Sequence, residues 1–449
     1  MRPETAALTA LDHQHLWHPF TAQDEWEAAG PPVFITRGRG VRLEDTEGRV
    51  YLDGVSSLWA NVHGHDHPRL RAALAAQAEA VVHSTMLGLS HAPGARLAAA
   101  LVDATAPLAF GGPPLQRVFF SDSGSTAVEV GLKIAFQAHQ LRGDRQRTRF
   151  AALAHAYHGD TVGAVSVGGI DLFHALYRPL LFDAVRLDSP LSAAPDEEAA
   201  CLDQARAALA AAGPTLAALV VEPLVQGAAG MRRHSPAFLR ALADAARAVG
   251  AYVVVDEVAT GFGRTGALFA CALAGLRPDV LCVAKGLSGG LLPLAATLVS
   301  EPIFDLFRGP YPAHRTLFHG HTFTGNPLAC AVALESLAVF RDEAVIQGLP
   351  PKIDALTALL GALPHVGATR QLGLMGAADL VHGRGPAARV GHAVCLAARR
   401  HGVLLRPLGD TLVFMPPLAM TPAEIAEMGA ATRAALTEVL GPAAAPHRG

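Results

Sequence analysis

Short apolar runs alternate with longer helical stretches between residues 116 and 300. Each run ends in polar or glycine-containing residues, as buried strands do. The alanine-rich stretches between them, such as 199–212 and 236–249, space their apolar residues as amphipathic helices do. This alternation predicts βαβ units around a mainly parallel sheet. Strands are expected at 117–121, 150–155, 216–223, 251–257, 280–285 and 294–300.

Both ends of the chain show a different pattern. Residues 33–55 alternate in character around a turn-like Thr46-Glu47-Gly48, which predicts a small antiparallel ribbon. The C-terminal part predicts helices around short strands near 371–381 and 403–415, before a loose tail at 441–449. We therefore expect an α/β fold in which both ends build a smaller α+β domain. The expected parts are 66–340 for the large domain, and 1–65 together with 341–449 for the small one.

Composition narrows the class of protein. No apolar run approaches the roughly 20 residues needed to cross a bilayer, and the N-terminus lacks the pattern of a secretory signal. Five scattered cysteines suit a reducing compartment, so a cytoplasmic location is expected. A net charge of −3 without runs of Lys or Arg argues against nucleic-acid binding. The sequence favours small-molecule chemistry, with no membrane and no nucleic acid as partner.

Unusual residues follow several of the expected strands. In open parallel sheets, ligands bind at the carboxyl ends of the strands. Gly124 and Ser125 follow the first run and open a helix, where free N–H groups can hold a phosphate. Tyr157 follows the second run, and Asp256 comes directly after three valines. Lys285 ends the next run.

Each of these residues alone has an ordinary interpretation. Lys285 could extend to the surface, and the Ser-Gly turn could be a plain helix cap. Together they indicate more, because a buried carboxylate such as Asp256 needs a cationic partner, which a pyridinium nitrogen would provide. A lysine amine becomes a nucleophile when its site disfavours the charged form. A carboxylate, a lysine and a phosphate site around one ring describe a pyridoxal phosphate pocket.

Eight stretches carry a resemblance to a known family. They are HLWHPFT (15–21), SSLWANVHGH (56–65), SDSGSTAVE (121–129), AYHGDTVGAVSVG (156–168), DEVATGFGRTG (256–266), AKGLSGG (284–290), HGHTFTGNPLACA (319–331) and RPLGD (406–410). With them the sequence resembles the class III (subgroup II) pyridoxal-phosphate aminotransferases of fold type I. Within this family it resembles the biotin-pathway branch, which converts 8-amino-7-oxononanoate to 7,8-diaminononanoate. The resemblance covers nearly the whole chain.

The resemblance implies a seven-stranded, mainly parallel sheet in the large domain and a homodimer with shared active sites. Lys285 would carry pyridoxal 5'-phosphate as a Schiff base and move protons, Asp256 would hold the pyridinium proton, and Tyr157 would stack near the ring. The phosphate would be bound by Gly124 and Ser125, with His321 and Thr322 from the second subunit.

The resemblance also implies a substrate cleft. Arg406 would pair with the carboxylate of the keto substrate, while Trp59 and Gly320 would line the cleft. Phe20 and Leu58 stand where adenosylmethionine-using members usually have tyrosine and tryptophan. The same pair of replacements occurs in the branch that resembles the lysine-using enzymes, although neutral drift would also produce it. The amino donor is therefore open between adenosylmethionine, the family default, and lysine.

Some features of the sequence also fit other classes of function. A metal-dependent hydrolase could use the His-rich loops, but their spacing differs from the helical pairs of zincins, so no metal is expected. An ω-amino-acid aminotransferase or a non-catalytic relative would share the fold. The HGHTFTGNP and RPLGD stretches argue against the first, and Lys285 argues against the second. The histidines concerned are His63, His65, His67, His319 and His321.

Overall fold

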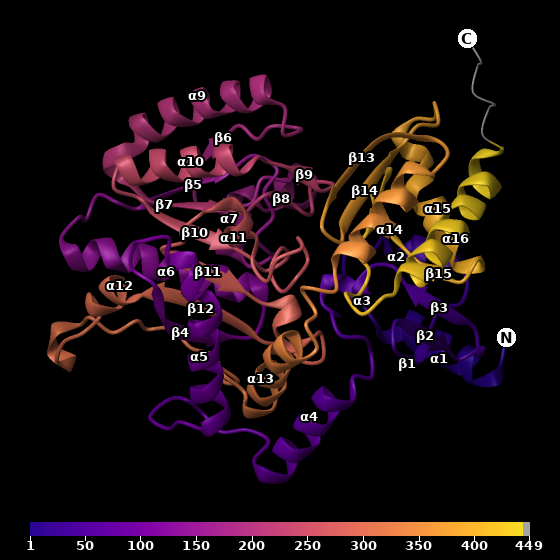
Figure 1. The fold of residues 1–449 in the computed structure, drawn as a ribbon, viewed down its shortest axis with the longest axis horizontal. Helices are drawn as coiled ribbons and strands as arrows, with labels where there is room; N and C mark the ends of the chain where they lie inside the picture. The colour runs from indigo at the N-terminus through magenta and orange to yellow at the C-terminus, as the bar shows by residue number, and fades with distance from the viewer. Residues whose placement is uncertain (443–449) are drawn as a thin grey trace.

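The structure is a computed structural model that describes residues 1–442, so the predicted tail at 441–449 lies almost entirely outside it (Figure 1). A seven-stranded sheet forms the centre of the large body, in the order β4-β12-β11-β10-β7-β5-β6. Only β12 runs against its neighbours, which confirms the predicted mainly parallel sheet. The strands are β4 (Leu115–Ser121), β5 (Arg149–Leu153), β6 (Ala184–Leu187), β7 (Leu216–Val221), β10 (Tyr252–Asp256), β11 (Val280–Val283) and β12 (Ala295–Ser300).

The two faces of this sheet are buried under different helices. Along β10, Val254 packs in a cluster with α6 (Gly124–Arg142), whereas Val253 and Val255 pack in another with α10 (Pro236–Ala248). Successive side chains of a strand point to opposite faces, so a run of valines packs against the helices on both faces of the sheet. The predicted helices at 199–212 and 236–249 are α9 (Pro195–Ala212) and α10.

The strand β6 is the one sheet strand that the apolar pattern did not predict. It is short, lies at the sheet edge, and is only partly buried before Leu187. Its Arg186 donates to the carbonyls of Ser166 and Val167, so a polar side chain is accommodated within it. Edge strands of this kind lack the continuous apolar character of central parallel strands.

The smaller body joins the two ends of the chain. The predicted ribbon at 33–55 has three strands, β1 (Ile35–Arg39), β2 (Arg42–Asp45) and β3 (Val50–Asp53). β3 pairs in parallel with β15 (Val403–Leu404) from the C-terminal part. A second sheet has the order β13-β14-β17-β16. Its strands are β13 (Val366–Leu372), β14 (Met375–Leu380), β16 (Arg406–Leu408) and β17 (Thr411–Phe414).

The predicted C-terminal strands near 371–381 and 403–415 correspond to these pieces, although β13 and β14 form a longer hairpin than expected. The domain boundaries at 65/66 and 340/341 stay a prediction. The helices of the small body are α14 (Pro350–Gly361), α15 (Val390–Arg400) and α16 (Pro422–Leu440).

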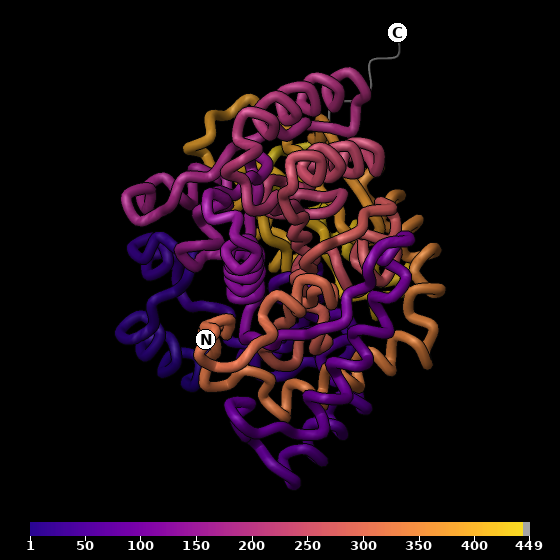
Figure 2. Tube along the Cα trace, turned by 90° about the vertical axis from the view of Figure 1, so that its left-hand side faces the viewer, coloured from indigo at the N-terminus to yellow at the C-terminus, as the bar shows by residue number. Residues whose placement is uncertain are grey.

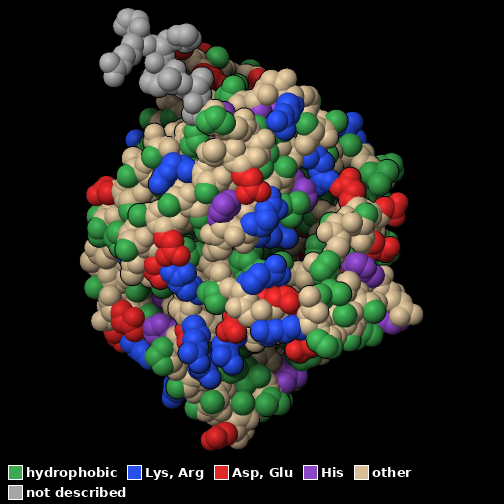
Figure 3. All heavy atoms as spheres, turned by 90° about the vertical axis from the view of Figure 1, so that its right-hand side faces the viewer, with side chains coloured by type: hydrophobic (Ala, Val, Ile, Leu, Met, Phe, Trp, Pro, Cys, Tyr) green, Lys and Arg blue, Asp and Glu red, His purple; other side chains and the backbone are tan. Residues whose placement is uncertain are grey.

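The remaining elements surround these two bodies. In Figure 2 the N-terminal helices, coloured indigo, lie at the edge of the molecule. Figure 3 shows the face seen from the right of Figure 1, where acidic and basic side chains are interspersed. None of the helices between residues 1 and 442 combines the length and apolar character needed to cross a bilayer. These elements are α1 (Pro3–His15), α2 (Gln23–Ala28), α3 (Ser56–Trp59), α4 (Pro68–Ala80), α5 (Ala92–Thr105), α7 (Val162–Val167), α8 (Asp171–His174), β8 (Val225–Gln226), β9 (Arg232–Arg233), α11 (Ala270–Ala274), α12 (Glu301–Asp305) and α13 (Pro327–Asp342).

Candidate active site

A cavity of about 750 Å³ opens at the carboxyl ends of the parallel strands. This is the place where an open α/β sheet binds its ligands. Its wall also includes residues from the N-terminal segment and from β16, so both ends of the chain contribute to it. The cavity brings together most of the residues singled out from the sequence. These are Phe20, Leu58, Trp59, Gly124, Ser125, Tyr157, Asp256, Lys285 and Arg406.

Three residues from the sequence analysis do not line the cavity within a single chain. Gly320, His321 and Thr322 lie in the segment that leads into α13. Within one chain this segment reaches the cavity through a neighbour. His321 Nδ1 lies 2.7 Å from Oδ2 of Asp122, and Asp122 lines the cavity. The prediction that His321 and Thr322 act in the site of a second subunit remains a prediction.

Lys285 lies two residues after the end of β11, in a left-handed backbone conformation with φ of 34°. Strain of this kind concentrates at functional sites. Burial lowers the pKa of its amine, while the negative charges of Asp256 and Glu222 act in the opposite direction. The amino nitrogen lies 5.2 Å from the centre of the Trp59 ring. The site thus favours a neutral, nucleophilic amine more than water does.

Asp256 ends β10 and is 4% exposed. Its Oδ1 accepts a hydrogen bond of 2.9 Å from the Val258 backbone N–H. Its Oδ2 lies 2.8 Å from Nδ1 of His158, whose side chain is buried. The imidazole thus orients the carboxylate, whose remaining lone pairs are free for a cation in the cavity. His158 was not singled out from the sequence, although its place two residues before Asp160 in YHGD was a usable signal.

Glu222 is a second buried carboxyl that the sequence reasoning missed. It follows β7 and lines the cavity. It accepts hydrogen bonds from the backbone N–H groups of Tyr157 (3.1 Å) and Gly227 (3.0 Å). Burial raises its pKa to about 7. The carboxyl therefore fixes the backbone that carries Tyr157.

An aromatic wall closes one side of the cavity. The Tyr157 hydroxyl donates to Asp160 Oδ2 at 2.7 Å, and burial together with this bond raises its pKa. The ring of Phe173 lies edge-on to Tyr157 at 6.2 Å and to Phe20 at 5.4 Å. Edge-to-face pairs of this type are favourable for aromatic rings. Phe173 was not predicted from the sequence.

The start of α6 forms a site for an anion. Ser123 caps the helix through a capping box with Thr126, which leaves the first N–H groups, at Gly124 and Ser125, outside the helical hydrogen bonds. A Cβ on Gly124 would lie 2.5 Å from Cγ1 of Val258, so only glycine fits there. The helix start therefore lies against the loop that follows Asp256.

These features fit a flat, phosphorylated pyridine ring. The helix start offers N–H donors for a phosphate, Asp256 offers a carboxylate for a ring cation, and Lys285 offers its amine. The buried His158 has no hydrogen-bond partner at Nε2 among the described residues, and faces Asp256 with its other nitrogen. The cavity volume is sufficient for such a cofactor together with a small substrate.

Three of the five histidines considered as metal ligands contact other side chains. His63 Nε2 bonds with Ser336, His65 with Asp53, and His67 with Glu343. Among residues 1–442, no three side chains of His, Cys, Asp or Glu are grouped as metal ligands are. These three imidazoles are thus engaged with side chains of the protein itself.

Comparison with known proteins identifies the class. The family model described as aminotransferase class-III matches residues 24–436. The chain belongs to this family, and it is a pyridoxal-phosphate-dependent aminotransferase of fold type I. The sequence prediction of family, fold class and cofactor is therefore confirmed.

Similar proteins indicate the branch of this family that the chain resembles. An adenosylmethionine-8-amino-7-oxononanoate aminotransferase of Nitratidesulfovibrio vulgaris is 50% identical, over 97% of this chain and 82% of the relative. One of Geobacter sulfurreducens is 46% identical, over 94% and 95%. The crystal structure of the enzyme of that name from Methanocaldococcus jannaschii has a TM-score of 0.91 and 37% identity, covering 97% of this chain and 99% of that one. A PLP-bound amine transaminase from an uncultivated Pseudomonas species has a TM-score of 0.88 and 34% identity, covering 95% and 99%.

Proposed function

We propose that this protein transfers an amino group to the 7-keto carbon of 8-amino-7-oxononanoate and so forms 7,8-diaminononanoate for biotin biosynthesis. The relatives that carry this activity in their names support it, at up to 50% identity over nearly the full chain. The observation that carries the proposal is the single cavity that gathers Lys285, Asp256 and Arg406. Together these supply a proton-transfer base, a carboxylate for a ring cation and a carboxylate-binding guanidinium.

When bound, pyridoxal phosphate supplies an electron sink for the carbon that loses or gains the amino group. The residues of this chain bind and orient it. Gly124 and Ser125 would hold the phosphate at the start of α6, and Asp256, oriented by His158, would hold a proton on the ring nitrogen. The Lys285 amine moves the proton at the reacting carbon, because its pKa is lowered by burial.

The acceptor substrate has a carboxylate at one end and a long apolar chain. Arg406, at the start of β16, would bind the carboxylate with two parallel hydrogen bonds. The apolar chain would lie along Trp59 and the aromatic wall. The cavity therefore matches both parts of the molecule.

The amino donor has two candidates. The names of the relatives favour adenosylmethionine. Phe20 and Leu58 favour lysine, because a phenyl ring lacks the hydroxyl that could bond a donor, and a leucine cannot stack on adenine. Both side chains are more than half exposed, at 59% and 51%, so they are available to a donor in the cavity.

A homodimer is part of the same proposal. The segments 81–91 and 321–327 lie side by side, since Asn326 donates to the Val82 carbonyl and His91 contacts the Gly325 carbonyl. They expose large apolar side chains, which is typical of an interaction surface. A second copy would cover this patch and bring Thr322 to a neighbouring cavity. The exposed apolar residues are Val81, Val82, Leu87, Leu89 and Phe323.

A cytoplasmic location also belongs to the proposal. All five cysteines are free, and Cys271, Cys282, Cys330 and Cys395 are buried. Free buried thiols are typical of a reducing compartment. Fractionation of the cells that make the protein would test this location.

The test of function is an assay of the purified holoenzyme with 8-amino-7-oxononanoate and, in turn, adenosylmethionine, lysine or glutamate. We expect 7,8-diaminononanoate with adenosylmethionine or lysine and none with glutamate. Activity confined to simple ω-amines, with no diaminononanoate from any donor, would contradict the proposal. It would favour the ω-amino-acid alternative.

A further inference from the structure

The turn that carries Leu58 and Trp59 into the cavity has an unusual backbone. Ser56, Ser57 and Trp59 have positive φ values of 53°, 61° and 64°. These conformations are unfavourable for residues with a side chain, and they persist only where neighbouring contacts hold them. The contacts that hold this turn therefore determine where the indole ring lies.

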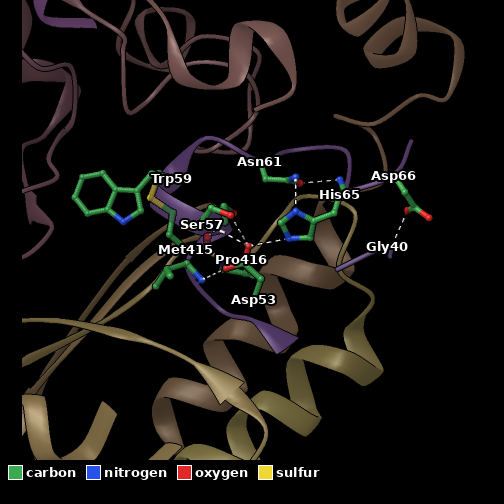
Figure 4. A network of polar contacts seen from close by, with 12 residues as sticks. Gly40, Asp53, Ser57, Trp59, Asn61, His65, Asp66, Met415 and Pro416 are labelled. Atoms are coloured by element: carbon green, nitrogen blue, oxygen red, sulfur yellow. Dashed lines mark hydrogen bonds and ion pairs between the residues drawn. The ribbon is translucent and has the colours of Figure 1, made fainter. Parts of the chain in front are cut away.

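A buried carboxylate lies at the centre of these contacts (Figure 4). Asp53 ends β3 and is 0% exposed. Its Oδ1 accepts a 3.2 Å hydrogen bond from the Val55 N–H, and its Oδ2 accepts one of 2.7 Å from the Ser57 N–H. Nε2 of His65 lies 3.1 Å from the same Oδ2. The strained turn and the loop after it are thus tied to one carboxylate.

The hydrogen bonds around His65 define which of its nitrogens carries the proton. The Gly64 N–H donates to Asn61 Oδ1 at 2.8 Å, which leaves the Asn61 amide group to donate to His65 Nδ1 at 3.2 Å. Nδ1 is therefore the acceptor and Nε2 the donor, toward Asp53. His65 is itself anchored, because its backbone N–H donates to the Gly40 carbonyl at 2.7 Å. Figure 4 shows the imidazole between Asn61 and Asp53.

A second group holds the other side of the turn. The buried guanidinium of Arg264 donates to the carbonyls of Trp59 at 3.4 Å and Asn61 at 2.8 Å. Ser56 adds a hydrogen bond of 2.7 Å from its hydroxyl to the Met415 carbonyl. The carbonyl side is thus fixed by Arg264, and the amide side by Asp53.

We propose that Asp53 and His65 form a positioning pair that sets the place of the Trp59 indole in the cavity, and through it the fit of the acceptor substrate. The link to the substrate rests on the proposed function. The indole lies 5.2 Å from the Lys285 amino nitrogen and touches Gly227, whose Cβ would lie 3.2 Å from the ring. Its buried Nε1 has no partner among the described residues, so it is free to donate to a ligand.

Two polar substitutions of His65 separate the hydrogen bond from the rest of the side chain. In His65→Gln the amide reaches about as far as Nε2 and can still donate to Asp53. In His65→Asn it reaches only about as far as Nδ1, so the contact with Asp53 is lost. As a control for the loop, His67→Asn changes an imidazole that faces Glu343 instead.

The first readout is the accessibility of the indole itself. The chain has three tryptophans, so Trp17→Phe with Trp26→Phe leaves Trp59 as the only one. Trp59 is 7% exposed and should resist quenching by acrylamide in the holoenzyme. We expect His65→Asn to raise the quenching constant about threefold over that of the single-tryptophan protein. His65→Gln and His67→Asn should stay within about twofold of it, because only His65→Asn loses the hydrogen bond to the Asp53 carboxylate.

The second readout is the separation of KM from kcat. We expect His65→Asn to raise the KM for 8-amino-7-oxononanoate about tenfold and to change kcat less than about threefold, since the base Lys285 stays in place. Unchanged quenching in His65→Asn, or equal quenching in His65→Asn and His65→Gln, would refute the proposal that Asp53 and His65 position Trp59. A rise in quenching with an unchanged KM would overturn its link to the substrate.

Failure of the proposed function can be distinguished from failure of the positioning pair. If the wild-type enzyme does not aminate 8-amino-7-oxononanoate, the proposed function fails, while the quenching experiment still decides whether the pair positions Trp59. If His65→Asn does not fold, Asp53→Asn replaces it. The amide keeps one oxygen acceptor but turns an NH2 group toward the remaining N–H donors, so quenching of Trp59 should again rise. Unchanged quenching in a folded Asp53→Asn variant would refute the proposed pair.

Discussion

Lys285 is the residue on which the proposed chemistry depends most directly. Lys285→Ala should remove the visible absorption of the lysine-bound cofactor and abolish turnover, because no other lysine lines the cavity among the described residues. Phosphate binding at Gly124 and Ser125 should persist. Absorption spectra and initial rates of the purified variant test this, with Lys133→Ala as a control at an exposed lysine. Turnover retained in Lys285→Ala would contradict the assignment.

Asp256 acts on the cofactor through charge. Asp256→Asn should leave the cofactor bound but lower kcat about 100-fold or more, because a neutral amide cannot hold a proton on the ring nitrogen. The hydrogen bond from His158 Nδ1 to the carbonyl of the amide would persist, so the geometry should survive. Single-turnover rates with bound cofactor measure the effect. An unchanged rate would refute the role of the carboxylate.

Arg406 is the test of substrate recognition. Arg406→Ala should raise the KM for the keto acid about 10- to 100-fold, since a charge-assisted bidentate contact is lost. The half-reaction with the amino donor should change much less. The two half-reactions can be followed separately by the spectrum of the cofactor. Equal slowing of both half-reactions would count against this role. Arg406→Lys should raise the KM less than Arg406→Ala does but not restore it, because an ammonium cannot bind a carboxylate in two parallel hydrogen bonds.

At the residue scale, sequence reasoning found the groups that end a strand and missed those that support them. Lys285 and Asp256 stand at the ends of apolar runs, where an ionisable side chain is conspicuous. His158 and Glu222 act through their neighbours, with His158 bonded to Asp256 and Glu222 to the Tyr157 backbone. Such partners come from different strands, so only the folded sheet brings them together.

Among the elements, the start of α6 makes a sharp prediction about packing. Gly124→Ala would place a methyl group 2.5 Å from Val258 Cγ1, so the helix start and the loop after Asp256 must separate. Overpacking of this kind costs roughly 1–3 kcal/mol, which corresponds to about a 5- to 140-fold loss of cofactor affinity if the whole cost falls on cofactor binding. Titration of the apoprotein with pyridoxal phosphate measures it.

The matched double variant gives the control for this element. Val258→Ala removes both methyl groups that crowd position 124, so adding it to Gly124→Ala should recover most of the affinity. If the affinity losses of Gly124→Ala and Val258→Ala simply add in the double variant, Gly124 matters for a reason other than its contact with Val258.

The strands show how far an apolar pattern predicts elements. The central strands β7, β10 and β11 are buried on both faces, so continuous runs of Val, Leu and Ala identify them. The edge strand β6 has a charged residue in its centre and carries no such signal. Some predicted carboxyl ends ran past the observed ones, as at β5, where Ala154 continues the apolar run beyond Leu153, the last residue of the strand.

At the scale of the whole molecule, the pairing of β3 with β15 brings the two chain ends into one body. This contact is between residues about 350 positions apart, and no local pattern determines it. It matters for the site, because Phe20 and Leu58 from one end and Arg406 from the other line the same cavity. The patterns at the two ends predicted a shared small domain, whereas the placement of these three residues in one cleft was implied only by the resemblance to the family.

The apolar patch on segments 81–91 and 321–327 makes the last prediction. The protein should sediment at twice the chain mass of 46.7 kDa, because a second copy would cover the exposed Leu87 and Phe323. Leu87→Asp should shift the equilibrium toward monomer, since a carboxylate would be buried in the interface. Activity per chain should fall with dilution, because Thr322 would no longer reach the neighbouring cavity. Leu191→Asp, at an exposed leucine outside these segments, should remain dimeric and active. A fully active monomer would refute shared sites.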